Sequence, residues 1–139
     1  NKETIEKSAE IAQASEFINS FENKYESSIT QGGTNVSGGQ RQRLSIARAL
    51  ASQAKILIFD DSFSALDFKT DKNLRKAIRE NIEATILIVA QRINTIKDAD
   101  QIIVLDQGKI VGIGKHHELL KNCPIYLEIA QSQLSEEEL

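Results

Sequence analysis

The sequence lacks the features that would tie it directly to a membrane or to nucleic acid. Its apolar runs are no longer than four or five residues, too short to cross a bilayer. The N-terminus has no basic segment followed by an apolar one, so it does not resemble an export signal. The net charge is −3 and no basic cluster is present, which argues against nucleic acid as the main partner. Any contact with a membrane is therefore expected through other segments.

Cysteine is also scarce. The chain has 139 residues and a single cysteine, Cys123, so no internal disulfide can form, as expected of a reducing cytosol. Thiol catalysis is disfavoured because Cys123 lies just before Pro124 and no motif surrounds it. His116 and His117 do not have metal-ligand spacing with Cys123, so we interpret them as part of a helix start before Glu118, with metal binding as the alternative.

The sequence has no phosphate-binding loop of the form Gly-x-x-x-x-Gly-Lys-Ser/Thr. The dipeptide Gly-Lys occurs at residues 108–109 and 114–115, but neither copy is followed by Ser or Thr, and neither has a glycine five positions earlier. Composition is otherwise ordinary, with 40% apolar and 27% charged residues in a length typical of one globular domain.

A glycine turn that opens a helix is the most informative stretch. Ser37 is a candidate N-cap, and Gly38 and Gly39 remove side chains just before a helix that is predicted from about Gln40. The unpaired N–H groups of the first turn and the positive end of the helix dipole form an anion site, for which phosphate is the expected guest. An ordinary glycine turn before an amphipathic helix is the alternative, and Ser-Gly-Gly alone favours it.

The motifs that follow this turn favour the anion site over an ordinary glycine turn. They are an apolar run ending in two aspartates at 56–61, Ser-Ala-Leu-Asp at 64–67, and a second apolar run at 86–90 followed by Gln91 and Arg92. Their order and spacing resemble the second half of an ATP-binding cassette (ABC) domain of exporter type, over essentially the whole chain. The resemblance implies that the four stretches are the signature motif, Walker B, the D-loop and the switch loop.

The resemblance also implies the fold class, which is α/β: a partial P-loop NTPase (RecA-like) core with a mostly parallel sheet, plus an N-terminal α-helical subdomain. We expect the helical subdomain, with the signature motif, at 1–53 and the C-terminal part of the ATPase core at 54–139. Hydrophobic patterning predicts helices at 4–19, capped by Thr4 or Ser8, and at 20–26, 71–81, 118–121 and 125–133. It predicts buried strands at 56–59, 86–89 and 102–105, and an antiparallel return at 110–113.

Asp60 and Asp61 end a predicted strand, where carboxylates can project into a crevice above the sheet. A hard oxygen ligand there suits Mg²⁺ carrying nucleotide phosphates, and capping of the next turn is the alternative. By resemblance, Asp60 holds Mg²⁺, and Asp61 stands where the family usually has a glutamate that polarises the attacking water. Aspartate is shorter by about 1.5 Å, and a misplacement of about 1 Å costs on the order of 10²-fold in rate.

Gln91 is the second departure from the family, which has a histidine there, hydrogen-bonded to the γ-phosphate of ATP. An amide can donate a hydrogen bond but cannot carry charge. Both departures fall on one catalytic half-site, so we hypothesise that this cassette is the degenerate-site subunit of a heterodimeric exporter. A homodimeric exporter, a regulatory module that holds ATP without hydrolysing it, and a soluble ABC ATPase acting on DNA or ribosomes are the alternatives.

In the family's geometry, each ATP lies between the Walker motifs of one cassette and the signature of the other. Ser37, Gly38, Gly39 and Gln40 would then serve the ATP of the partner cassette, and Asp67 would lie at the dimer interface. The segment 27–33 occupies the place that faces the membrane domains in exporters, although Gln31 stands where an acidic residue is common.

The missing phosphate-binding loop is expected upstream of Asn1, so we expect this piece alone to bind ATP weakly and to be inactive. The resemblance places the whole protein at the cytoplasmic face of the cell membrane, with transmembrane domains on the same polypeptide. It also implies a missing strand between those at 86–89 and 102–105, and we expect self-association or strand exchange to fill that gap, with closing up of the two strands as the alternative.

Overall fold

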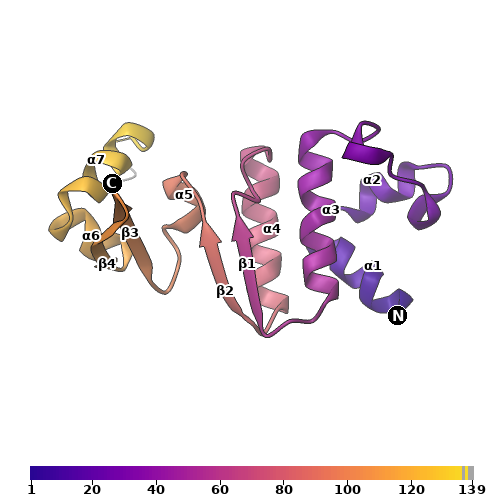
Figure 1. Ribbon diagram of the computed structural model, residues 1–139, viewed down its shortest axis with the longest axis horizontal. Coiled ribbons are helices and arrows are strands. Elements are labelled where there is room, and N and C mark those ends of the chain that lie inside the picture. The colour runs from indigo at the N-terminus through magenta and orange to yellow at the C-terminus, as the bar shows by residue number, and fades with distance from the viewer. Residues whose placement is uncertain (136, 138–139) are drawn as a thin grey trace. The chain divides into compact units, whose positions relative to one another are not determined.

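The computed structural model describes residues 1–135 and residue 137, and it divides into two compact units, Asn1–Val89 and Ala90–Leu139 (Figure 1). Each unit has its own two-stranded sheet and its own apolar core. No helix in this described part of the chain is long and apolar enough to cross a membrane.

The first unit begins with two helices, α1 (Lys2–Ile11) and α2 (Ser15–Ser20), where the sequence predicts one. The predicted helix at 4–19 is wrong because the chain turns at Gln13, whose φ is +57°. This turn brings Ala12 and Ala14, both fully buried, into the core. The predicted caps at Thr4 and Ser8 are also wrong, since the Asn1 side chain accepts the N–H of Glu3 at 2.9 Å.

Two short 3₁₀ turns follow, η1 (Lys24–Glu26) and η2 (Gln31–Gly33). Of the helix predicted at 20–26, only η1 forms. The chain then enters α3 (Gly38–Ala51), which leads into β1 (Ile56–Asp60). Helix α4 (Phe68–Asn81) connects β1 to β2 (Thr85–Val89), and it begins three residues before the predicted start because Asp67 caps it.

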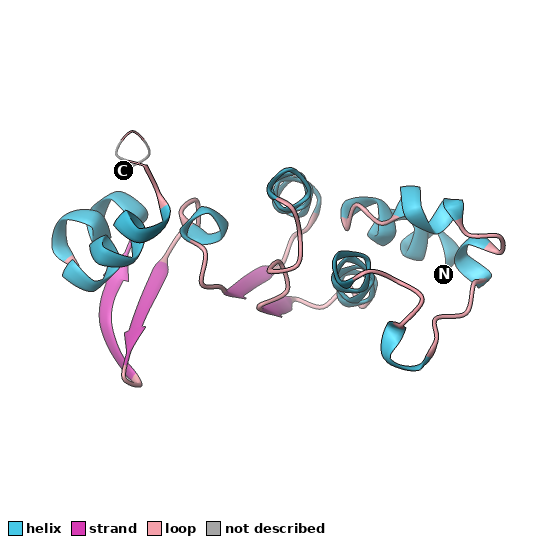
Figure 2. Ribbon diagram, turned by 90° about the horizontal axis from the view of Figure 1, so that it is seen from above, coloured by secondary structure: helices cyan, strands magenta, loops and turns pink. Residues whose placement is uncertain are grey.

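Strands β1 and β2 pair in parallel, as predicted, with Leu57 opposite Ile86 and Phe59 opposite Ile88. Side chains on this face pack into a core shared with Leu74 of α4. In Figure 2, α4 lies against one side of the two strands. Burial of the opposite face was predicted wrongly, because no element of the described first unit covers it. Its exposed side chains are those of Ile56, Ile58, Leu87 and Val89.

The second unit consists of α5 (Ile93–Ile96), the hairpin β3 (Ile102–Asp106) and β4 (Lys109–Gly114), and the helices α6 (His116–Asn122) and α7 (Pro124–Gln133). The predicted antiparallel return is confirmed, and its turn places Gln107 and Gly108 at positive φ. Pro124 is the first residue of α7, as predicted. One face of the hairpin packs on α6 and α7. The other exposes Ile103, Leu105, Ile110 and Ile113.

A buried histidine gives the second unit a pH dependence. His116 opens α6, and its Nδ1 lies 2.8 Å from the hydroxyl of Tyr126. Burial lowers the pKa of His116 from its ordinary 6.5; the charges of His117 and Lys97 lower it further, and Asp98 opposes them. The unfolded chain therefore binds a proton at a pH where the folded chain does not, so this contribution is fully present above pH 6.5 and is lost below it.

We expect the urea midpoint of the chain to fall as the pH is lowered from about 7.5 to about 5.5, where histidine titrates. His116→Phe should remove the contribution of His116 to that fall, whereas His117→Phe, at an exposed position, removes only a cause smaller than burial and should leave most of the fall in place. An identical pH dependence in wild type and His116→Phe would contradict this assignment.

Candidate functional site

The predicted cap at Ser37 is confirmed, although α3 begins at Gly38, two residues before the predicted start. Ser37 Oγ accepts the N–H of Gln40 at 3.2 Å, and Gln40 Oε1 accepts the N–H of Ser37 at 2.9 Å. This capping box leaves the N–H groups of Gly38 and Gly39 without an acceptor inside the helix. The signature turn (residues 37–40) thus presents backbone donors at the positive end of the α3 dipole, as an anion site requires.

The two glycines of the signature turn have different surroundings. A Cβ on Gly39 would lie 3.0 Å from the carbonyl oxygen of Ala65, whereas a Cβ on Gly38 would lie 3.7 Å from the Cβ of Ala65. The first approach is tight enough that a larger residue would push the loop backbone back by a few tenths of an ångström, and the second is an ordinary contact. Gly39 therefore lets α3 pack on the loop at residues 61–66, which we call the Asp61 loop.

Gln42 joins α3 to the Asp61 loop by hydrogen bonds. Its Nε2 donates to the carbonyl oxygen of Asp61 at 3.2 Å and to Ser64 Oγ at 3.0 Å, and its Oε1 accepts the N–H of Ala65 at 2.9 Å. Sequence reasoning missed Gln42. The available signal was its position four residues after Gly38, which places it on the helical face that carries the signature turn.

Asp61 has a left-handed backbone, with φ at +49°. Aspartate adopts this conformation more readily than most residues, and such strain persists where the surroundings hold it. Its N–H donates to the carbonyl of Val89 at 3.0 Å, and its carbonyl accepts from both Gln42 and Ser64. The backbone of Asp61 is thus held on both sides, and its side chain stays exposed.

Asp60 is the last residue of β1, opposite Val89 in the register, and it is exposed. Within residues 1–135 and 137, no three side chains of His, Cys, Asp or Glu cluster as a metal site. Mg²⁺ does not need such a cage, because it commonly keeps several waters and binds one or two carboxylates together with substrate phosphates. An exposed carboxylate at the end of β1 fits that mode, and Asp60 would be the protein ligand.

Asp67 caps α4 with both carboxylate oxygens. Oδ1 accepts the N–H of Thr70 at 3.0 Å, and Oδ2 accepts the hydroxyl of Thr70 at 2.6 Å. The hydrogen bond from the Thr70 hydroxyl contributes most to lowering the pKa of Asp67, and the hydrogen bond from the Thr70 N–H comes next. The exposed side chain is therefore charged at neutral pH. This cap fixes Asp67, the residue directly after the Asp61 loop, at the start of α4.

Gln91 belongs to the second unit, whereas the other predicted site residues belong to the first. Its backbone carbonyl accepts from Gln133 Nε2 at 2.8 Å, and Gln133 Oε1 accepts the N–H of Ile93 at 2.9 Å. Gln133 thus holds the backbone on both sides of Arg92 against α7, while the Gln91 residue itself is exposed. Sequence reasoning also missed Gln133, because more than 40 residues separate it from Gln91 and no local pattern links them.

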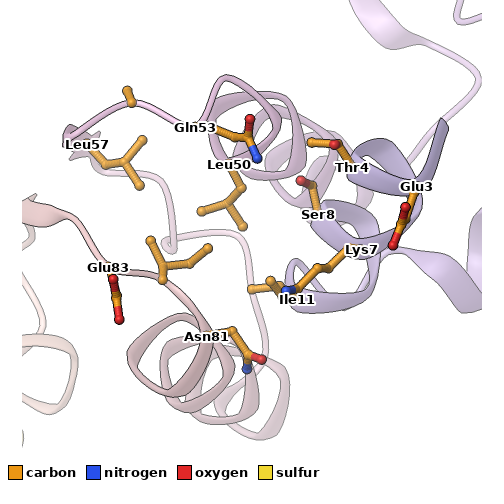
Figure 3. Close-up of a pocket in the computed structure, with 12 residues that line it drawn as sticks. Glu3, Thr4, Lys7, Ser8, Ile11, Leu50, Gln53, Leu57, Asn81 and Glu83 are labelled. Atoms are coloured by element: carbon orange, nitrogen blue, oxygen red, sulfur yellow. The ribbon is translucent and has the colours of Figure 1, made fainter. Parts of the chain in front are cut away.

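A hollow of about 430 Å³ lies elsewhere in the first unit, lined by residues of α1, α3, β1, α4 and the segments that follow α3 and α4 (Figure 3). Leu50, Leu57 and Ile11 form part of its wall, and Glu3 and Lys7 also line it. None of the predicted site residues lines it. Within the signature turn and the Asp61 loop, Ser37, Gly38 and Asp61 are instead exposed, as a site shared with another molecule requires.

Comparison with known proteins supports the resemblance found in the motifs. The family model described as "ABC transporter" matches residues 1–64, from α1 through the signature turn and into the Asp61 loop. An ABC transporter ATP-binding protein of Mycoplasma genitalium is 45% identical over 132 residues, which are 94% of this chain and 21% of that protein. This chain is part of an ABC transporter nucleotide-binding domain.

Other relatives and a solved structure extend the similarity of this nucleotide-binding domain beyond residue 64. An ATP-dependent lipid A-core flippase of Aliivibrio fischeri is 43% identical over 95% of the chain and 23% of the flippase. A bacterial Atm1-family ABC exporter, solved with ATP bound, matches 98% of the chain and 24% of its own length at 34% identity and a TM-score of 0.92. The chain spans about a fifth of the length of the curated relatives it matches. The predicted α/β fold class with a partial ATPase core is confirmed by this similarity.

Proposed function

We propose that the whole protein is the ATPase subunit of an ABC exporter, in which ATP binding and hydrolysis drive transport across a membrane. The observation that carries this proposal is the signature turn, with its two unpaired glycine N–H groups, packed directly on the loop that holds Asp61. The names of the relatives, which include ATP-dependent flippases, point the same way.

Each site residue has a role in this proposal. Asp60 binds Mg²⁺, which when bound supplies positive charge to the phosphates of ATP. Asp61 accepts a hydrogen bond from the attacking water, and Gln91 donates one to the γ-phosphate. The Gly38 and Gly39 N–H groups, with the capping box of Ser37 and Gln40, bind the phosphates of the ATP held by the partner cassette. Asp67 lies at the interface with that cassette.

We further propose that this subunit supplies the degenerate site of a heterodimer. Its support is chemical: Asp61 is one methylene shorter than glutamate, and Gln91 cannot carry the charge of a protonated histidine. The signature turn shows no such departure, since its cap and its glycine donors are complete. The partner's ATP would therefore meet an intact signature, while the ATP on this chain's own Walker motifs would be hydrolysed slowly.

Other parts of the proposal concern the surroundings of the chain. The division into a helical subdomain at 1–53 and an ATPase core at 54–139 is proposed from the motifs. Transmembrane domains on the same polypeptide, and a place at the cytoplasmic face of the membrane, follow from the family. The chain as a separate piece would be inactive and would self-associate through its uncovered apolar sheet faces, where Ile58 and Leu105 are each 66% exposed. A monodisperse monomer in light scattering would contradict self-association.

Gly38→Asp tests the anion site of the signature turn. The side chain has room, since the nearest atom to a Cβ there lies at 3.7 Å, and a carboxylate at a helix N-terminus favours the helix. The same carboxylate repels a phosphate, so we expect ATP turnover by the full-length protein with its partner to fall by roughly 10²-fold. Folding should be unchanged or improved.

Gly38→Ala is the matched control, and we expect it to keep turnover within about threefold of wild type, because it adds an ordinary contact and no charge. Equal turnover in Gly38→Asp and wild type would show that no anion binds at this turn.

A further inference from the structure

We propose that Gln42 is a positioning residue that locks the Asp61 loop to the signature turn, so that the two move as one body. This inference rests on the proposed function, since it assigns the signature turn and Asp61 to nucleotide chemistry. The stretch 36–43 that resembles the signature motif contains Gln42, but the resemblance assigns it no role, and the inference comes from its contacts.

The Gln42 side chain is suited to this task because one amide group meets three different partners. Two are acceptors, the Asp61 carbonyl and Ser64 Oγ, and the third is a donor, the N–H of Ala65. A carboxylate of the same length could accept from Ala65 but could not donate to Asp61. Gln42 is half-buried on α3, and its three hydrogen bonds are exposed, so their effect is to fix the position of the loop and not to satisfy buried polar groups.

The contact with Asp61 holds a strained backbone in place. A left-handed aspartate at φ +49° relaxes unless its peptide groups are held. Val89 holds the N–H, at 3.0 Å, and Gln42 and Ser64 hold the carbonyl. Ser64 lies in the same loop as Asp61, so of these two donors only Gln42 ties the Asp61 carbonyl to another element, α3.

Gln42 therefore connects two groups of residues that belong to two different ATP sites. In the proposed dimer, the signature turn of this chain contacts the ATP held by the partner, and Asp61 contacts the ATP on this chain's own Walker motifs. Because Gln42 joins α3 to the Asp61 loop, and Gly39 packs on Ala65 of the same loop, a shift at one site is transmitted to the other. Loss of the Gln42 amide should displace both the signature turn and Asp61, although Gln42 itself makes no contact with ATP.

The test uses the full-length protein assembled with its partner subunit in lipid. Two quantities are measured: ATP turnover as a function of ATP concentration, and hydrogen exchange of a peptide covering residues 62–66, which reports the N–H of Ala65. For Gln42→Ala we expect kcat to fall about tenfold, KM for ATP to change less than about twofold, and exchange at Ala65 to become about tenfold faster. Gln42→Glu, which keeps the acceptor for Ala65, should fall between wild type and Gln42→Ala in both measurements.

Gln131→Ala is the matched control, since Gln131 is an exposed glutamine on α7, and it should change neither quantity. Three results would overturn the proposal: unchanged exchange at Ala65, unchanged kcat despite faster exchange, or a tenfold rise in KM at constant kcat, which would indicate a direct contact with ATP. If Gln42→Ala does not fold, the same three criteria apply to Gln42→Glu. If the wild-type assembly shows no ATP turnover, the proposed function fails, and the exchange at Ala65 alone decides whether Gln42 holds the loop.

Discussion

Replacing Asp61 by Glu and Gln91 by His in the same chain is expected to raise ATP hydrolysis at this chain's own Walker site by about 10²-fold. The first change lengthens the carboxylate by one methylene and brings it to the water that it polarises. The second restores a side chain that can carry charge next to the γ-phosphate. The gain has a limit, because residue 61 has φ at +49°, a conformation that glutamate adopts less readily than aspartate.

The measurement is single-turnover hydrolysis by the assembled heterodimer in which the partner's own catalytic carboxylate has been replaced, so that only this chain's site reports. Asp61→Asn with Gln91→His is the control, since it keeps the restored histidine but removes the carboxylate, and it should show no gain. If Asp61→Glu with Gln91→His leaves the rate unchanged, the two departures are not the cause of slow hydrolysis.

Arg75→Leu is expected to destabilise the first unit by about 3 kcal/mol, because it leaves a buried carboxylate without its charged partner. Asp71, on the first turn of α4, is 2% exposed. Arg75, one turn further on, donates from Nε to Asp71 Oδ1 at 2.9 Å and from Nη2 to Oδ2 at 3.4 Å. The Arg75 side chain is itself only 16% exposed, so water cannot readily replace it.

Urea unfolding of the chain measures this loss, and α4 supplies a matched control. Lys76 and Glu80 form an i,i+4 pair on the same helix at 3.8 Å, but their side chains are 72% and 58% exposed. Lys76→Leu should therefore change the free energy of unfolding by less than about 0.5 kcal/mol. Similar losses for Arg75→Leu and Lys76→Leu would show that burial of Asp71 does not set the size of the effect.

Elements with a local signal were predictable from the sequence. The start of α3 was recognised within two residues, because Ser37 and the glycines after it carry both the cap and the turn. The hairpin was recognised because Gln107 and Gly108 form a two-residue turn between apolar runs. The break at Gln13 was not, since no glycine or proline marks it and tertiary burial of the alanines on either side decides it.

Burial of the strands was predictable only in part. An unbroken apolar run such as 56–59 predicts cover on both faces, and the structure covers Leu57 and Phe59 but leaves Ile56 and Ile58 exposed. A single sequence shows that a face is apolar, but it does not show which segment covers that face.

Residues of the candidate site were likewise predictable only where a local pattern marks them. The motifs identified Ser37, Asp60 and Asp61 because their residue types recur at a fixed spacing. They did not identify Gln42 or Gln133, whose amides act on backbone groups about 20 and 40 residues away. Such contacts depend on how the chain folds back, and no local pattern records them.

ATP turnover of the full-length protein in lipid, alone and with its candidate partner subunit, each with and without Asp61→Ala, tests the central claim most directly. The degenerate-site account predicts turnover only with the partner, and turnover that survives Asp61→Ala, because the intact signature turn of this chain serves the partner's ATP. Turnover by the protein alone that Asp61→Ala abolishes would contradict the account, and would show Asp61 to be a working catalytic residue in a homodimer.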